Sequence, residues 1–156
     1  MSSDASIKFD GVDGESVKPA GEIDVISWNW NVSQPVGPAG GGSGLGKAIP
    51  GDFHFTHLYD KASPVLAKKC VAGTHFKDAK LTARKAGEGQ QDFLVVTMKE
   101  VFIKGVNPGG SNGGDILEQV KCSYKDIEFA YKTQGDKGAL GGEVKFGWDV
   151  AKSETR

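Results

Sequence analysis

The chain has 156 residues, and its 19 Lys and Arg against 20 Asp and Glu give a formal net charge of −1. This length predicts one domain that is large enough to bury a sizeable core. The balanced charge argues against a nucleic-acid-binding protein, which normally carries a basic excess, and against a polybasic membrane patch. Glycine is over-represented, with 23 residues, about twice its average share. Many glycines between short apolar runs indicate many turns, and therefore an all-β domain.

The two cysteines, Cys70 and Cys122, are too few for a disulfide framework or a four-cysteine zinc site. We expect both to be reduced thiols, as in a cytosolic protein. Residues 1–6 have neither the basic nor the apolar region of a secretory signal. No apolar stretch approaches the roughly 18 residues of a membrane span. We therefore expect no membrane insertion, and export, if it occurs, without a cleaved signal.

Apolar and polar residues alternate in several segments with the period of two that marks a β-strand. In chain order these segments are residues 7–9, 23–32, 53–55, 79–84, 93–98, 101–106, 120–124, 127–131 and 144–150. Within 23–32, Ile23 and Val25 have the opposite parity to Trp28 and Trp30, which predicts a β-bulge or a bend in one long strand. Residues 93–98 are apolar on both parities, as in a strand covered on both faces.

One segment has the signals of a helix instead. Ser63 is placed as an N-cap, Pro64 follows at the first helical position, and Gly73 stands where a C-terminal glycine is favoured. The sequence predicts a short amphipathic helix over residues 64–72. We expect its apolar stripe to cover an open end or side of the β layer; the stripe consists of Val65, Leu66, Cys70 and Val71.

The remaining segments are loops. The three most prominent are the Gly- and Pro-rich residues 34–47, then residues 107–115 and residues 134–142. No change of composition divides the chain, so residues 1–156 are predicted to form a single domain. We expect residues 1–5 and 152–156 to be flexible ends and residues 34–47 to be an extended loop.

The longest loop contains a partial phosphate-binding motif. Gly41-Gly42-Ser43-Gly44-Leu45-Gly46-Lys47 fits the beginning of a P-loop, whose backbone N–H groups cradle phosphates at the start of a helix. The motif needs Ser or Thr after the lysine, but Ala48 stands there, and Pro50 opposes the required helix. A contact-making loop is therefore favoured over a nucleotide site.

Other chemistry-bearing residues do not form a recognisable site. Asp10, Asp13 and Glu15 lack the spacing of a calcium loop and are typical of a turn, with calcium left as a minor alternative. His54 and His57 are three positions apart on one predicted strand, so they point to opposite faces. We expect His75 to be an exposed connector residue. No nucleophile elbow is present. We predict no catalytic residue, no cofactor and no metal.

The segment around Trp28 has two different faces. Trp28 and Trp30 share their parity with Ile26 and Val32, so packing into the core is favoured over a sugar-binding platform. Asn29 and Asn31 fall on the other face of the same strand, where a solvated surface is expected.

Taken in order along nearly the whole chain, several segments resemble the Hcp family, the haemolysin-coregulated proteins of the bacterial type VI secretion system. The resembling segments are residues 9–16 (FDGVDGES), 22–30 (EIDVISWNW), the 40–47 loop, 60–64 (DKASP), 79–87 (AKLTARKAG), 108–111 (PGGS) and 144–149 (VKFGWD). Each segment is a weak signal alone, but the ordered set is specific.

The resemblance implies a mainly β fold, a two-sheet β-barrel with one short helix on its side, similar to phage tail-tube proteins. It implies homohexameric rings that stack into a tube inside a contractile sheath, behind a spike and baseplate. Such a tube is cytoplasmic before firing and is then secreted to the medium or into a target cell, with small effector proteins carried in its lumen. Members are not enzymes unless a toxin domain is fused at the C-terminus. We expect no fusion here, because the chain ends shortly after the last predicted strand.

Two sets of residues follow as candidates for this role. If Trp28 and Trp30 face the core, Asn29 and Asn31 are candidates for the lumen and for cargo contact. The candidate ring-stacking loop consists of Gly40, Gly41, Gly42, Ser43, Gly44, Leu45, Gly46 and Lys47. The alternative function is a monomeric β-barrel that binds a small ligand or sugar, and the oligomeric state distinguishes the two.

Overall fold

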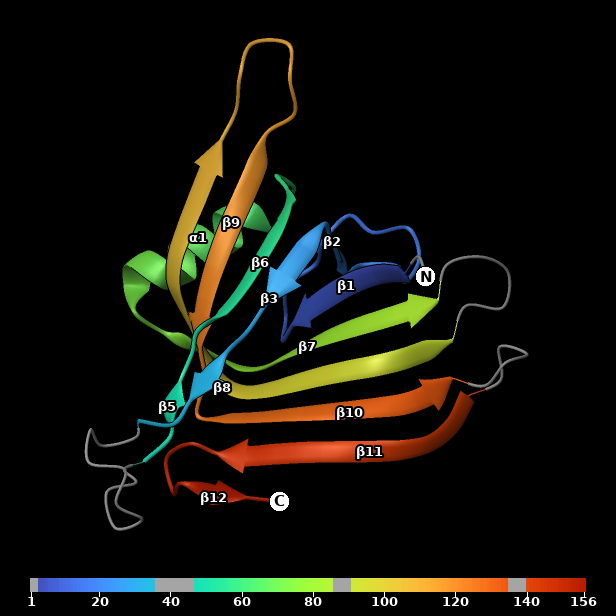
Figure 1. The fold of residues 1–156 in the computed structure, drawn as a ribbon. Helices are drawn as coiled ribbons and strands as arrows, with labels where there is room; N and C mark the ends of the chain where they lie inside the picture. Colours follow the sequence, from blue (N-terminus) through green and yellow to red (C-terminus); the bar gives the residue numbers. More distant parts are fainter. Residues whose placement is uncertain (1–2, 36–46, 86–90, 135–139) are drawn as a thin grey trace.

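The computed structural model describes residues 3–35, 47–85, 91–134 and 140–156, which form a β-barrel with a helix at its side (Figure 1). The first half of the chain contains β1 (Ser3–Phe9), β2 (Ile23–Val25), β3 (Ser27–Asn29), β4 (Val32–Ser33), β5 (Ile49–Pro50), β6 (Phe53–Leu58) and the helix α1 (Ser63–Ala72). Of these, β4 and β5 pair with each other in a separate two-stranded sheet. The second half contains β7 (His75–Lys85), β8 (Asp92–Gly109), β9 (Leu117–Ser123), β10 (Asp126–Gln134), β11 (Leu140–Asp149) and β12 (Glu154–Thr155). Within these ranges no helix is long and apolar enough to cross a membrane.

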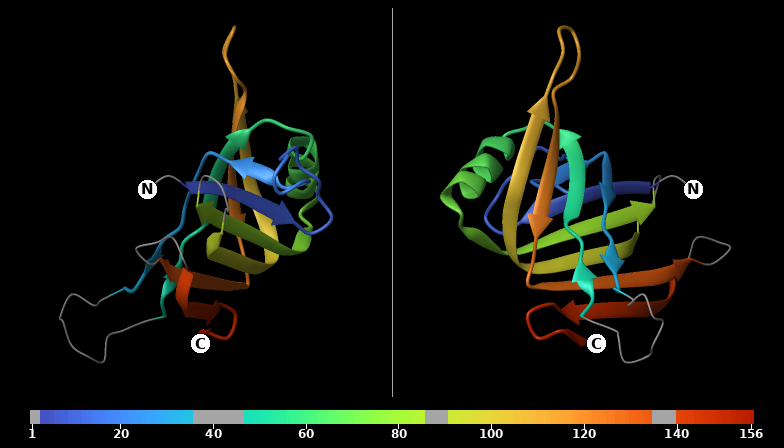
Figure 2. Two further views of the ribbon diagram at one scale, coloured as in Figure 1. Left: turned by 90° about the vertical axis from the view of Figure 1, so that its right-hand side faces the viewer. Right: turned by 60° about the vertical axis from the view of Figure 1, so that its left-hand side comes forward.

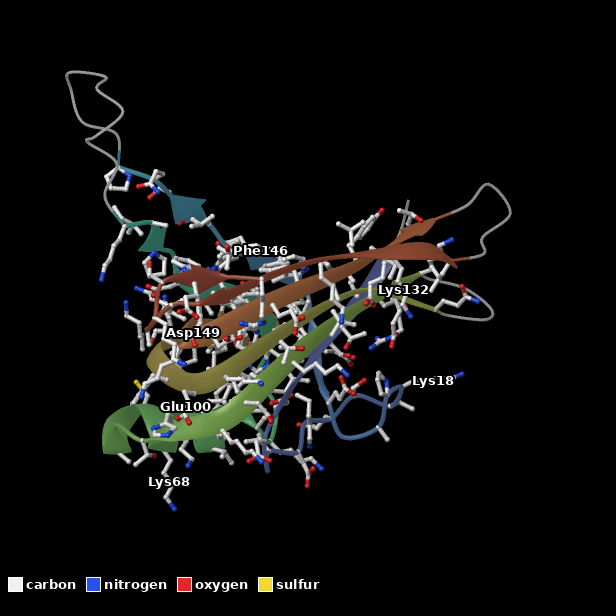
Figure 3. The ribbon with its side chains drawn as sticks, turned by 90° about the horizontal axis from the view of Figure 1, so that it is seen from below. Lys18, Lys68, Glu100, Lys132, Phe146 and Asp149 are labelled. Carbon is white, nitrogen blue, oxygen red and sulfur yellow. The ribbon has the colours of Figure 1, made fainter. Side chains whose placement is uncertain are left out.

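The long strand β8 belongs to both walls of the barrel. Its first part pairs with β7 and β10 in a wall ordered β2-β1-β7-β8-β10-β11-β12. From Phe102 onward it pairs with β9, which continues the other wall through β6 to β3. Between the two parts Glu100 has φ 53°, a left-handed conformation that is uncommon for a residue with a side chain. Figure 3 places Glu100 at this bend, close to α1.

The core lies between the two walls and is formed by the inward residues of nearly every strand. Phe9 is fully buried, and its ring centroid lies 5.9 Å from that of Phe55 and 5.1 Å from that of Phe76. Further members of the same buried cluster are Ile7, Ile23, Phe53, Leu81, Val96, Met98, Val120 and Ile127. The predicted period of two is confirmed for β6 and β9, whose alternate side chains are exposed or half-buried. On β1 and β7 the alternate residues Ser6, Thr82 and Arg84 are buried as well, so these strands are covered on both sides.

The segment 23–32 differs from its prediction as one bulged strand. It changes partner: β2 pairs with β1, whereas β3 pairs with β6. Ile26 lies at the junction, where its N–H donates to the Thr56 carbonyl and its side chain is 59% exposed. The change of parity in the sequence therefore marks the passage from one wall to the other.

The predicted helix is present and one residue longer at its start. Pro64 lies in its first turn, and Gly73 ends it in the left-handed conformation, as expected. The N-cap is Ala62 rather than Ser63, and the Asp60 carboxylate accepts the Ala62 N–H at 2.9 Å. The apolar stripe is narrower than predicted: Leu66 is fully buried, but Val71 is 90% exposed.

The ends of the described chain take part in strand pairing. Residues 3–5 begin β1 and lie opposite residues 83–85 of β7. At the other end β12 pairs with β11, and the Arg156 guanidinium donates to both carboxylate oxygens of Asp126 at 2.8 and 2.7 Å. The physical reason is that each end supplies backbone hydrogen bonds to a sheet edge.

A hydrogen-bonded relay ties the end of β3 to the other wall. The Trp30 indole N–H donates to the Tyr124 hydroxyl, which donates in turn to the Gly51 carbonyl at 2.7 Å. The Trp30 ring also lies 4.9 Å, centroid to centroid, from the ring of Phe129. Burial raises the pKa of Tyr124, so its hydroxyl remains protonated, and able to donate, further into the alkaline range. Trp30 is therefore a packed residue, as predicted.

Removing the hydroxyl should show the contribution of this relay. Tyr124→Phe leaves the Gly51 carbonyl and the Trp30 N–H without their partner, which should lower the free energy of unfolding by about 1–2 kcal/mol. The measurement is equilibrium unfolding in urea. Tyr131→Phe is the matched control, because the Tyr131 ring is exposed. Equal effects of the two substitutions would contradict the relay's role.

Candidate functional site

Polar side chains cover the outer side of the wall made by β3, β6, β9 and the second part of β8. They form two rows across the strands, fixed by the cross-strand register. One row is Asn29, His54, Lys121 and Gly105, and the next is Ser27, Thr56, Gln119 and Asn107. We call these two rows the polar face. It is outward because the residues between them in each strand, such as Phe55 and Val120, are buried.

The two candidate lumen residues have different surroundings. Asn29 is exposed, lies at the end of β3 and is directly opposite His54, so it belongs to the polar face. Asn31 is also exposed but lies beyond β3, outside both rows, and its backbone carbonyl accepts the Gly51 N–H at 2.9 Å. The structure therefore groups Asn29, but not Asn31, with the other polar side chains.

The sequence alone did not predict that one surface contains His54, Lys121, Gln119 and Asn107. A signal was present, because His54 and Thr56 alternate with buried aromatic residues, as Gln119 and Lys121 do with Val120 and Cys122. Alternation shows which residues of one strand share a side. Alternation does not show which other strand of the sheet is the neighbour of that strand.

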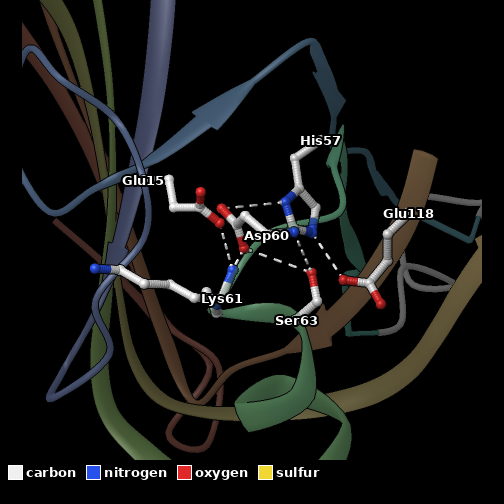
Figure 4. Close-up of polar contacts among 7 residues, drawn as sticks. Glu15, His57, Asp60, Lys61, Ser63 and Glu118 are labelled. Carbon is white, nitrogen blue, oxygen red and sulfur yellow. Dashed lines mark hydrogen bonds and ion pairs between the residues drawn. The ribbon is translucent and has the colours of Figure 1, made fainter. Parts of the chain in front are cut away.

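On the inner side of the same strands lies a buried histidine–glutamate pair. His57 and Glu118 are directly opposite each other on β6 and β9, and the His57 Nε2–H donates to Glu118 Oε1 at 2.8 Å. The His57 ring is fully buried and Glu118 is 1% exposed. The other ring nitrogen, Nδ1, lies 3.8 Å from Asp60 Oδ2 and has no hydrogen-bond partner among the described residues (Figure 4).

This pair is connected to the start of α1. Asp60 follows β6, and its backbone N–H donates to the Ser63 hydroxyl at 3.0 Å. The next backbone N–H, that of Lys61, donates to Glu15 at 2.7 Å (Figure 4). The polar contacts thus join β6, β9, the residue 10–16 loop and the first turn of the helix. His54 and His57 point to opposite sides, as predicted, and His75 is exposed beside Glu100.

The described residues do not form an enzyme-like centre. Among them, no group of three or more His, Cys, Asp or Glu could hold a metal ion. Residues 40–46 of the partial P-loop lie outside the described ranges; Lys47 is exposed, and the strand β5 follows where the motif requires a helix. Burial raises the pKa of the Cys122 thiol far above its usual range, so the thiol remains protonated and unreactive.

Comparison with known proteins decides the family. The profile described as "Type VI secretion system effector, Hcp" matches residues 7–131. The chain belongs to the Hcp family. It is 42% identical to Protein hcp1 of Pseudomonas aeruginosa, with 98% of each chain covered. Membership places the chain among structural, non-enzymatic components of the type VI secretion system.

Solved Hcp structures have the same fold. Hcp1 from Salmonella typhimurium superposes with a TM-score of 0.84 at 34% identity, over the full length of both chains. A chain described as a type six secretion system protein superposes with a TM-score of 0.92 at 27% identity, over 99% of this chain and 100% of the other. The predicted fold class, mainly β with one short helix, is confirmed.

We expect the buried pair of this Hcp chain to be essential for stability. His57→Ala leaves the Glu118 carboxylate buried without its partner, which should cost about 3–5 kcal/mol of unfolding free energy. Urea unfolding followed by tryptophan fluorescence measures this cost.

The chain offers a matched control in His75, which pairs with Glu100 while both side chains are more than two-fifths exposed. His75→Ala should cost at most about 1 kcal/mol, because an exposed pair contributes little. A His57→Ala cost as small as that of His75→Ala would contradict the assignment.

Proposed function

We propose that this chain is the subunit of a type VI secretion inner tube, in which hexameric rings stack inside a contractile sheath. In this role it is made in the cytoplasm, assembles behind the spike and baseplate, and is secreted with small effector proteins in its lumen. The observation that carries the proposal, beyond membership in the family, is an uncovered apolar patch suited to self-association.

This apolar patch lies at the base of the hairpin formed by β8 and β9, which projects beyond the barrel (Figure 2). Leu58 and Leu117 are directly opposite each other, and the Tyr59 N–H donates to the Ile116 carbonyl at 2.9 Å. Ile26 lines the same hollow as Leu58 and Tyr59. All five side chains are between 44% and 59% exposed. Neighbouring exposed apolar side chains of this kind mark protein–protein contacts.

A second exposed apolar set lies at the opposite end of the barrel. Val32 and Ile49 belong to β4 and β5 and are 44% and 53% exposed. Val32 lines a hollow together with Phe146 and Trp148. Figure 1 shows β4 and β5 beside β12, far from the projecting hairpin. Two different patches on one subunit are what a ring requires, because each interface joins unlike surfaces.

The polar face supports the assignment of a lumen surface. It is free of large apolar side chains over both rows, so it fits a wall in contact with water and cargo. We assign Asn29 and, beside the wall, Asn31 to the lumen. We keep the loop Gly40–Lys47 as the ring-stacking segment, since a glycine-rich stretch can adopt the backbone angles needed to reach a neighbouring ring.

Native mass spectrometry tests the ring. The unmodified chain should give a six-subunit mass, and Leu58→Glu should shift it toward the monomer, because a carboxylate would be buried in the apolar patch. Val71→Glu is the control, since Val71 is 90% exposed on α1, away from the patch. A monomer of the unmodified chain at all concentrations would favour the alternative, a monomeric ligand-binding barrel.

Substitution of Asn29 tests the lumen assignment. Asn29→Trp should change the amount of a co-expressed small effector that is retained, because a bulky ring would occupy the cargo-facing surface, while the six-subunit mass remains. Asn29→Ala, which removes bulk, is the size control. Co-purification followed by quantitative mass spectrometry is the measurement. Unchanged retention, or loss of the hexamer, would count against the assignment.

A further inference from the structure

The charges of the polar face are unbalanced. Lys121 is the permanently charged residue in the two rows, and neither row contains a carboxylate. Directly beyond the rows, Asp52 accepts from the Lys104 ammonium at 3.1 and 3.0 Å, so that pair is neutral. The described part of this wall therefore has a surplus positive charge on its outer side, although the whole chain has a net charge of −1.

Some cations of the described chain have an acidic partner, and Lys121 is one of those that do not. Lys8 pairs with Asp13 at 3.0 Å, Lys145 with Glu143 at 3.3 Å, and Arg156 with Asp126 at 2.7 Å. Lys121 is exposed and pairs with no carboxylate among the described residues. Its ammonium group carries three donors that are available to an external acceptor.

The neighbours of Lys121 form a place for such an acceptor. His54 lies directly opposite on one side, and Asn29 lies opposite His54, so three side chains that can donate hydrogen bonds follow one another across β9, β6 and β3. On the other side Gly105 has no side chain, and nothing lies within 4 Å of where its Cβ would be. The result is a hollow of ≈ 320 Å³, also lined by Asn107 and Gln119.

We infer that the polar face binds acidic side chains of the cargo, with the Lys121 ammonium as the anchoring cation and His54 and Asn29 as flanking donors. This inference rests on the proposed function and specifies the chemistry of its cargo surface. A carboxylate fits because charge-assisted hydrogen bonds to an ammonium are stronger than neutral ones. One exposed contact is weak, but a ring repeats it in every subunit, so an acidic cargo surface binds several at once.

The experiment uses the full chain and a fluorescein-labelled oligoglutamate peptide, with binding measured by fluorescence anisotropy. The unmodified chain should bind the peptide at low salt and release it at about 0.5 M salt, where charges are screened beyond about 3–5 Å. Lys121→Glu should weaken binding by about fivefold or more. Lys68→Glu changes the net charge equally on the solvent side of α1 (Figure 3) and should leave binding within about twofold.

A second variant keeps the lysine. Gly105→Asp places a carboxylate directly opposite Lys121, where the side chain has room, so it should pair with the ammonium and weaken peptide binding to a similar extent. Circular dichroism of each variant confirms that it is folded. Equal binding by Lys121→Glu and Lys68→Glu would overturn the inference, as would a preference for an oligothymidylate of equal charge.

The outcomes for the ring and for the cargo surface are separable. Native mass spectrometry of the same samples measures the number of subunits, and fluorescence anisotropy measures binding of the oligoglutamate peptide. A six-subunit mass without loss of binding in Lys121→Glu would overturn the inference and leave the tube assignment intact. A monomer that still loses binding in Lys121→Glu, but not in Lys68→Glu, would overturn the ring and support the acid-binding surface.

Discussion

The whole barrel depends on the passage of β8 from one wall to the other. A strand exposes alternate residues to opposite sides, and both walls need their apolar side turned toward the same core. At Glu100 the backbone takes a left-handed conformation, and at residues 103–105 the register with β9 shifts by one residue. These two irregularities let a strand of 18 residues pair with β7 and β10 first and with β9 afterwards. Val101, Ile103 and Met98 all reach the core as a result.

The outer surface of the second wall follows from that arrangement. The register shift places Gly105, which has no side chain, opposite Lys121, and the register of β6 places His54 on the other side of the same lysine. A hollow and a free cation are therefore adjacent because of strand pairing, although the residues come from segments up to 92 positions apart, from Asn29 to Lys121. The same strands carry the His57–Glu118 pair inward, so one register sets both the exposed row and the buried pair.

The buried pair lies where the barrel, the helix and the projecting hairpin meet. Glu118 lies near the start of β9, where the strand runs from the projecting hairpin into the barrel. The preceding residue, the exposed Leu117, belongs to the apolar patch. A buried carboxylate is unfavourable unless a partner compensates it, so His57 fixes the position of β9 at this point. The hairpin that offers the patch for association is thereby held in a defined direction relative to α1 and the polar face.

The sequence by itself determined the local structure and, through its ordered segments, the family. The period of two predicted the strands, Pro64 and Gly73 predicted the helix to within one residue, and the parity of His54 and His57 placed them on opposite sides. Alternation could not predict that β2 and β3 pair with different strands, that the chain ends join sheets, or that Lys121 lies beside His54. Strand pairing and register depend on contacts between distant segments, which local patterns do not encode. The sequence therefore predicted that Asn29 faces away from the core. Only the tertiary structure decided that His54 and Lys121 lie in the same row of the polar face.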